Sequence, residues 1–225
     1  MIGKNFVDKC LKSKILTNPW AHTITDSHIN EKEFDNLRSQ CKKLLDIKMK
    51  DMPTHKGIIE NHITPEHFKS FNIDWYDQIF DISKNIYEHR NELCDVFPKH
   101  RWYDDLVVTA YIGVTPPAPY DHHIHSETLS KVWSSVTYVT PEKNCGTKMY
   151  DTEYKPTFKH GTKMYTESVK ESLVKEVEWK PNSTMIFAGI DGKTWHSYNS
   201  TEQSNRITLN LFIKQKQGSI KKFYP

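Results

Sequence analysis

The sequence is poor in the features that would cross-link the chain or place it in a membrane. It has four cysteines, Cys10, Cys41, Cys94 and Cys145, and no two of them have the close spacing of a zinc knuckle or a disulfide framework. We therefore expect reduced thiols. No stretch approaches the roughly eighteen consecutive apolar residues of a transmembrane helix. Lysines interrupt the apolar residues of segment 1–16, which is unlike a signal peptide. We expect a soluble, cytoplasmic protein.

The sequence also has no marked excess of positive or negative charge. The 31 basic and 28 acidic residues give a formal net charge of +3, and no run of five or six like charges occurs. This balance gives no reason to expect an extended nucleic-acid surface or a membrane surface as a partner.

The length and the distribution of apolar residues predict one domain with two unequal parts. A chain of 225 residues fits a single domain over residues 1–225. Within it, residues 1–100 are expected to be mainly helical support, and residues 104–217 to form a β core.

Two segments of the first part have apolar residues at helical spacing. In 31–48 these residues form one stripe, and Asn30 is suited to cap the helix N-terminus. A second helix is predicted over 74–96, and Pro98 ends it.

The second part changes to short β-branched and aromatic runs separated by turn residues. These runs are "LVVTAYIGV", "KVWSSVTYVT", "TKMYD", "EVEWKP", "TMIFAG", "TWHSY" and "RITLNLFIK". Many short strands after two helices predict an α+β domain built on an antiparallel sandwich or barrel. A jelly roll, or double-stranded β-helix, with the N-terminal helices packed on one sheet is one such architecture.

The segment "DHHIHSETLSK" at 121–131 is dense in groups that bind metals. Residues i and i+2 of a strand point to the same side, so His125 and Glu127 form a candidate ligand pair. His123 and His125 form a competing one. Two histidines and one carboxylate on one face are a common site for an iron that reacts with oxygen.

The remaining candidates lie near the C-terminus. His196 in "GKTWHSYN" is the candidate third ligand, and ten residues later Arg206 begins a strand in which Arg206, Thr208 and Asn210 share one face. An arginine beside a hydroxyl can bind a carboxylate through charge-assisted hydrogen bonds. Alone, His196 is more often structural and Arg206 more often a solvated charge. Their combination with the H-x-E pair favours a functional site.

These motifs resemble the iron(II)- and 2-oxoglutarate-dependent oxygenases, in particular the small prolyl-4-hydroxylase-like members of phage and bacteria. The resemblance lies in "NPWAHTITDSHINEKEFDNL", "HSETLSKVWSSVTYVTPEKNCGTKMYD" and "WKPNSTMIFAGIDGKTWHSYNSTEQSNRITLNLFI". It implies that His125, Glu127 and His196 ligate Fe(II). It also implies that Arg206, helped by Thr208, binds the distal carboxylate of 2-oxoglutarate. Tyr111 resembles a tyrosine that some members point at this co-substrate, although a packed barrel tyrosine is the alternative interpretation.

The resemblance further implies a reaction. The protein would use Fe(II) as its cofactor and consume 2-oxoglutarate and O₂ to hydroxylate a small-molecule or polypeptide substrate. Succinate and CO₂ would be released. The protein would lie in the cytoplasm of a bacterial or phage-infected cell. Whether it forms a homodimer is left open by the sequence. Glu127 departs from the family, since most relatives carry aspartate there.

Two alternatives remain at the level of the sequence. The first is a cupin-type metal-dependent isomerase or lyase, in which His123, His125 and His196 surround the metal and Arg206 has no role. The second is a non-enzymatic jelly-roll binding module whose histidines lie in a polar loop.

Overall fold

The computed structural model describes most of the chain. The described residues are 2–48, 61–98, 105–127, 130–151, 157–159, 162–164, 172–190, 192–200 and 202–216.

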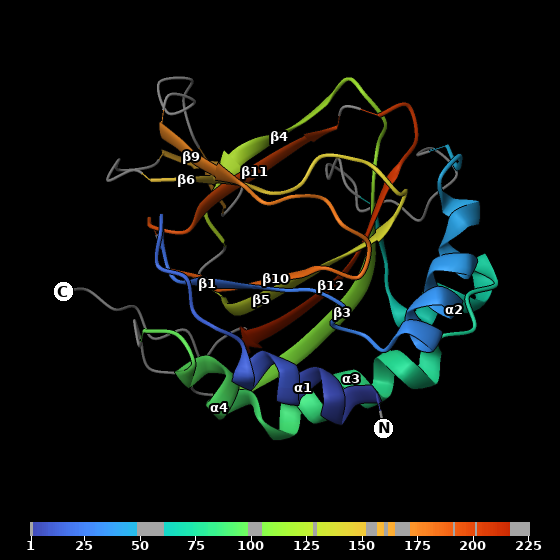
Figure 1. The fold of residues 1–225 in the computed structure, drawn as a ribbon, viewed down its shortest axis with the longest axis horizontal. Helices are drawn as coiled ribbons and strands as arrows, with labels where there is room; N and C mark the ends of the chain where they lie inside the picture. Colours follow the sequence, from blue (N-terminus) through green and yellow to red (C-terminus); the bar gives the residue numbers. More distant parts are fainter. Residues whose placement is uncertain are drawn as a thin grey trace.

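Twelve described strands form two antiparallel sheets that face each other (Figure 1). The major sheet has the order β1-β10-β5-β12-β3-β2, and the minor sheet has the order β7-β8-β4-β11-β6-β9. The strands of the major sheet are β1 (His22–Thr25), β2 (Asn61–Ile63), β3 (Leu106–Thr115), β5 (Lys131–Thr140), β10 (Thr184–Ala188) and β12 (Arg206–Gln215). Those of the minor sheet are β4 (Tyr120–His125), β6 (Lys148–Tyr150), β7 (Thr157–Lys159), β8 (Thr162–Met164), β9 (Leu173–Glu176) and β11 (Trp195–Ser200).

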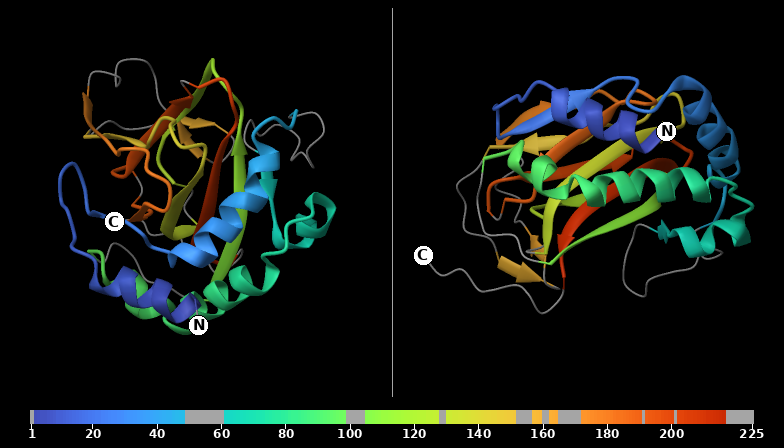
Figure 2. Two further views of the ribbon diagram at one scale, coloured as in Figure 1. Left: turned by 45° about the vertical axis from the view of Figure 1, so that its right-hand side comes forward. Right: turned by 90° about the horizontal axis from the view of Figure 1, so that it is seen from below.

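The helices cover the outer face of the major sheet, as the view from below in Figure 2 shows. The chain contributes four α-helices and two 3₁₀ helices among its described residues. They are α1 (Ile2–Lys12), α2 (Glu31–Cys41), η1 (Lys42–Leu44), η3 (Pro65–Phe71), α3 (Tyr76–Glu88) and α4 (Arg90–Asp95). Within the described part of the chain, no helix is both long and apolar enough to cross a bilayer.

The alternation of β12 divides the interior into two regions. Ile207, Leu209, Leu211 and Ile213 are buried against the helices in one large apolar cluster. The opposite face, which starts at Arg206, points between the two sheets. Each buried Leu or Ile contributes about 1.5 to 3 kcal/mol, so the outer face of β12 contributes strongly to the stability of the sheet.

The helix predictions are confirmed in position and corrected in extent. The Asn30 side chain accepts a hydrogen bond from the Glu33 amide and caps α2, as expected. The segment 74–96 is not one helix, because the backbone leaves helical geometry at His89, with φ −106° and ψ 18°. His89 Nδ1 also lies 3.0 Å from the Asn85 carbonyl oxygen and competes for it. Helix α1 was not predicted.

The strand predictions are confirmed except at one segment. "KVWSSVTYVT" coincides with β5 and "RITLNLFIK" lies within β12. "EVEWKP" was expected to be a strand, but β9 ends at Glu176 and residues 177–180 are not in a strand. There the Trp179 ring stacks on Tyr138 with centroids 4.6 Å apart, and its indole donates to the Pro141 carbonyl, so packing replaces strand pairing. All four cysteines are buried and reduced, as expected.

A buried Cys–His contact joins α1 to the turn before α2. Cys10 Sγ lies 3.3 Å from His28 Nε2, and the Phe6 ring packs edge-on against the imidazole. Burial, assisted by the positive charge of Lys9, lowers the pKa of His28 to about 3. Burial also holds the Cys10 thiol neutral by raising its pKa. Both groups are therefore uncharged parts of the core.

This burial predicts a loss of stability in acid. Below pH 6.5 the unfolded chain protonates His28 and the folded chain does not, so the free energy of unfolding should fall by about 1.4 kcal/mol per pH unit from this group. Denaturant unfolding at pH 7, 5.5 and 4.5 measures the slope. In His28→Gln the slope should be smaller by that amount. Parallel slopes for the two proteins would contradict the prediction.

Candidate functional site

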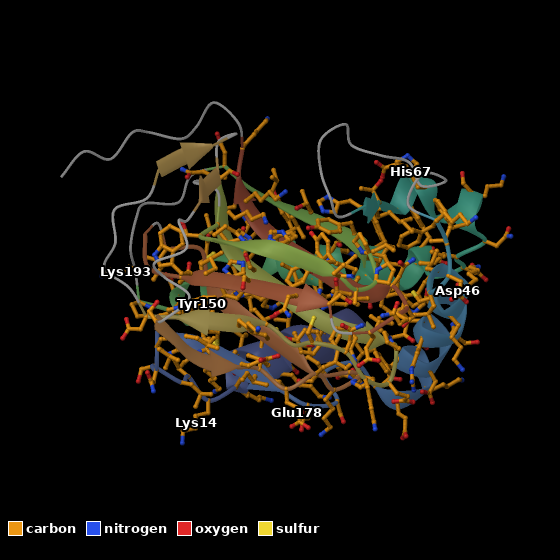
Figure 3. The ribbon with its side chains drawn as sticks, turned by 90° about the horizontal axis from the view of Figure 1, so that it is seen from above. Lys14, Asp46, His67, Tyr150, Glu178 and Lys193 are labelled. Atoms are coloured by element: carbon orange, nitrogen blue, oxygen red, sulfur yellow. The ribbon has the colours of Figure 1, made fainter. Side chains whose placement is uncertain are left out.

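His125 and His196 are brought together between the two sheets. They are direct cross-strand partners at the end of β4 and the start of β11, and their ring centroids lie 4.3 Å apart. His196 is 7% exposed. Beside it on β11, Ser197 Oγ lies 2.8 Å from the hydroxyl of Tyr150 on β6, which fixes β11 on its other edge (Figure 3).

The surroundings of His196 keep it in the form that binds metals. Its Nδ1 lies 2.9 Å from the Thr194 carbonyl oxygen, so Nδ1 carries the hydrogen and Nε2 carries the lone pair. Burial lowers the pKa of His196, and the nearby negative charge of Glu127 only partly opposes this effect. At neutral pH the imidazole is therefore uncharged.

A third imidazole, which the sequence analysis missed, lies next to this pair. The pairing of β4 with β11 shifts register between His196 and Tyr198, so Tyr198 pairs with His122. The His122 ring is 4.4 Å from the His125 ring and 4.7 Å from the Tyr198 ring. A simple alternation would place His122 and His125 on opposite faces, and only the irregularity unites them. The side chain of His123 lies outside the described residues.

Glu127 is close to this cluster but is held by other partners. It lies two residues beyond the end of β4, so strand alternation does not place it. Its Oε1 accepts a hydrogen bond from Ser134 at 3.0 Å, and its Oε2 lies 2.7 Å from Lys131 Nζ. Burial alone would raise the pKa of the Glu127 carboxyl. The positive charge of Lys131, that of His196 when it is protonated in acid, and these hydrogen bonds outweigh burial and hold that pKa below its ordinary value.

The three predicted ligands therefore lie in one region without forming a complete metal site. Among the described residues, no three His, Cys, Asp or Glu side chains are grouped so that they could hold a metal ion. The assignment of His125, Glu127 and His196 as ligands stays a prediction. Gly189 lets the chain after β10 pass close to this region, because a Cβ there would lie 2.2 Å from the Lys131 carbonyl oxygen.

Arg206 lies on the inner face of β12 in an aromatic cage. Its side chain is 1% exposed, and its guanidinium carbon is 4.1 Å from the ring centre of Tyr198, 5.1 Å from Trp179 and 5.5 Å from Tyr138. Its Nε donates to the Cys145 carbonyl at 3.3 Å. Next to Cys145, Gly146 lets the backbone of Val177 pass close by, since a Cβ there would overlap the Val177 carbonyl oxygen at 1.5 Å.

The guanidinium has hydrogen-bonding capacity to spare. One terminal nitrogen of Arg206, Nη2, is buried without a hydrogen-bond partner, and no acidic side chain within the described ranges forms an ion pair with this residue. Thr115 is the cross-strand partner of Arg206 on β3, and its buried hydroxyl also lacks a partner. Thr208 accepts a hydrogen bond from Asn210 at 2.9 Å and keeps its own hydroxyl hydrogen to donate. An anionic group is what such a site lacks.

Tyr111 lies farther along β3. It pairs with Asn210 and not with Arg206, and its ring stacks on His62 at 3.8 Å and lies 5.5 Å from Phe212. Tyr111 precedes Thr115 by four positions along β3, or about 13 Å at the usual rise of a strand. The predicted role of Tyr111 in binding the co-substrate stays a prediction.

Comparisons with known proteins identify the fold. No protein-family model matches the sequence, and no curated protein matches it. The structure is similar to the epimerase SnoN in complex with Fe³⁺, α-ketoglutarate and nogalamycin RO, with a TM-score of 0.56 and 8% identity over 86% of this chain and 78% of that one. It is also similar to a prolyl hydroxylase from Trichoplax adhaerens in complex with a hypoxia inducible factor peptide, with a TM-score of 0.54 and 9% identity over 96% and 90% of the two chains. The predicted double-stranded β-helix fold is confirmed.

The buried Glu127–Lys131 pair allows a test that is independent of activity. Replacement of Lys131 by Met leaves a buried carboxylate without its counter-charge, so we expect a loss of about 2 to 4 kcal/mol in the free energy of unfolding. Restoring neutrality in the double variant Glu127→Gln/Lys131→Met should recover part of the loss. Denaturant unfolding of the wild type and of both variants at pH 7 measures these differences.

The matched control is Lys180→Met. Lys180 forms an equally short pair with Asp26 at 2.6 Å, but both side chains are 55% exposed. An exposed pair is worth about 0 to 1 kcal/mol. Equal losses in Lys131→Met and Lys180→Met would contradict the assignment of a buried, strongly coupled carboxylate at the site.

Proposed function

We propose that this protein is an Fe(II)- and 2-oxoglutarate-dependent oxygenase that hydroxylates a substrate C–H bond and releases succinate and CO₂. The observation that carries the proposal is the buried Arg206, whose unmatched donor lies one aromatic ring away from His122, the imidazole next to the facing pair His125 and His196. Tyr198 forms that link, since its ring contacts both Arg206 and His122. The likeness of the fold to SnoN and to a prolyl hydroxylase supports it.

His125, Glu127 and His196 would hold the metal. Two imidazoles and one carboxylate are a donor set suited to Fe(II), and they leave coordination positions open for other ligands. Glu127 can join only when at least one of its oxygens leaves Lys131 or Ser134, or is shared between the lysine and the metal. The bound iron would supply the activation of O₂ that protein side chains cannot perform.

Arg206 would bind the distal carboxylate of 2-oxoglutarate. The guanidinium can donate two parallel hydrogen bonds to a carboxylate, and the hydroxyls of Thr115 and Thr208 lie on the same inner face. The surrounding rings of Tyr138, Trp179 and Tyr198 exclude water, which strengthens an ion pair formed there. These residues bind and orient the co-substrate and take no part in proton transfer.

The proposal predicts that Arg206→Met separates binding from stability. Because no described acidic side chain pairs with Arg206 and would be left buried and unpaired, the variant should fold with an unchanged or higher melting temperature. Its affinity for the 2-oxoglutarate analogue N-oxalylglycine should fall about 100-fold in the presence of Mn(II), because a charge-assisted bidentate contact is lost. Calorimetry measures the affinity, and succinate release measures turnover in the wild type with Fe(II).

Arg90→Met is the matched control. Arg90 also lies over a tyrosine ring, with its guanidinium carbon 4.2 Å from the centre of Tyr87, but on the exposed surface. Its replacement should leave N-oxalylglycine binding unchanged. A wild type that binds Mn(II) but not N-oxalylglycine would sink the proposal and favour the cupin-type alternative. A wild type that binds neither would favour the non-enzymatic module.

A further inference from the structure

His122 lies beside the predicted metal ligands, and the proposed function gives it no role. From His196 to Tyr198, β11 advances by two residues, while the paired stretch of β4 advances by three. The extra residue makes a bulge in β4. Bulges redirect side chains and are frequent next to active sites. This bulge places His122 on the same side of β4 as His125, facing the space between the two sheets.

The His122 ring contacts both parts of the proposed site. Its centre lies 4.4 Å from the centre of the His125 ring. It also lies 4.7 Å from the centre of the Tyr198 ring, and the Arg206 guanidinium carbon lies 4.1 Å from that same centre. The series of contacts that leads from the guanidinium to the facing histidines therefore passes through His122.

His122 is more accessible than the tyrosines around it. Tyr198 and Tyr120 are 8% and 9% exposed, whereas His122 and His125 are half-buried. Tyr120 meets the His122 ring edge-on, with centroids 6.4 Å apart. A ligand that extends from Arg206 to His125 can therefore contact the His122 imidazole, while the two tyrosines pack against its ring.

The co-substrate of the proposed function has two carboxylates, and Arg206 would bind only the distal one. The other carboxylate, beside the keto group, belongs to the end that reaches the metal. An ionised carboxylate accepts hydrogen bonds at both of its oxygens. A metal that takes one of these oxygens leaves the other for a donor of the protein. An imidazole N–H can supply this hydrogen bond, which is strengthened by the charge of the acceptor.

We propose that His122 donates a hydrogen bond to the carboxylate beside the keto group of the co-substrate and so holds that end next to the metal ligands. The inference rests on the proposed function, because it requires 2-oxoglutarate to extend from Arg206 to the facing histidines. Two residues would then recognise the two ends of one molecule, Arg206 the distal carboxylate and His122 the other.

Two small ligands separate these two ends. N-oxalylglycine has both carboxylates, whereas N-acetylglycine keeps the distal carboxylate and has a methyl group in place of the other. Calorimetry on the full chain with Mn(II) measures their affinities, with N-acetylglycine titrated in competition with N-oxalylglycine. In His122→Phe, which keeps a flat ring without a donor, N-oxalylglycine should bind about tenfold more weakly, the cost of one hydrogen bond to a charged group. N-acetylglycine should bind this variant as it binds the wild type.

Two further variants serve as controls. His122→Gln keeps an N–H donor, so it should bind N-oxalylglycine more tightly than His122→Phe does. His67→Phe makes the same exchange at a half-buried histidine of η3, whose Nδ1 lies 2.8 Å from the Thr64 hydroxyl, away from the labelled Tyr150 (Figure 3). It should bind both ligands as the wild type does. Mn(II) should bind all these proteins equally, because His122 is not a metal ligand in this proposal.

Three results would overturn the inference and leave the proposed function intact. They are N-oxalylglycine binding to His122→Phe as tight as to His67→Phe, an equal loss for both ligands in His122→Phe, and a loss of Mn(II) affinity in that variant. The last result would make His122 a metal ligand. A wild type that does not bind N-oxalylglycine would overturn the inference and the proposed function together.

Discussion

The alternation of β12 is the constraint on which the rest of the structure depends. One face of this strand buries Ile207, Leu209, Leu211 and Ile213 against the helices. Its pairing with β3 and β5 on both sides fixes the register of the major sheet. A slip of one residue would exchange the two faces and place Arg206 in the apolar core. The helical layer therefore stabilises the sheet and at the same time sets the direction of every inner side chain.

On the inner face, this stability compensates for polar and charged groups whose burial opposes folding. A buried guanidinium with no acidic partner among the described residues, two lysines opposite each other and two facing imidazoles are all partly or wholly removed from water. Arrangements of this kind persist only where the surrounding structure is stable enough to impose them. All three lie on the inner faces of the two sheets, whereas the outer face of β12 carries Ile207, Leu209, Leu211 and Ile213. The distribution itself separates support from function.

The sequence predicts what depends on periodicity and misses what depends on irregularity. The two faces of β12, the strand β5 and the cap at Asn30 follow from local patterns and are confirmed. The place of His122 depends on a register shift between β4 and β11, and the place of Thr115 on pairing across 91 residues of chain, 115 to 206. Glu127 was placed by strand alternation, but it lies beyond its strand and its position is set by Lys131. No local pattern encodes these contacts.

Lys131 joins the predicted ligand Glu127 to the far end of β12. It forms an ion pair with Glu127 and also lies opposite Lys214, so any change in one contact changes the electrostatic energy of the other. On the proposed function, the metal and Lys131 would compete for the Glu127 carboxylate, so the ion pair would weaken metal binding and metal binding would weaken the ion pair. Linkage requires that the effect be equal in both directions. The ion pair that compensates the buried carboxylate would thus also limit the affinity of the site for its metal.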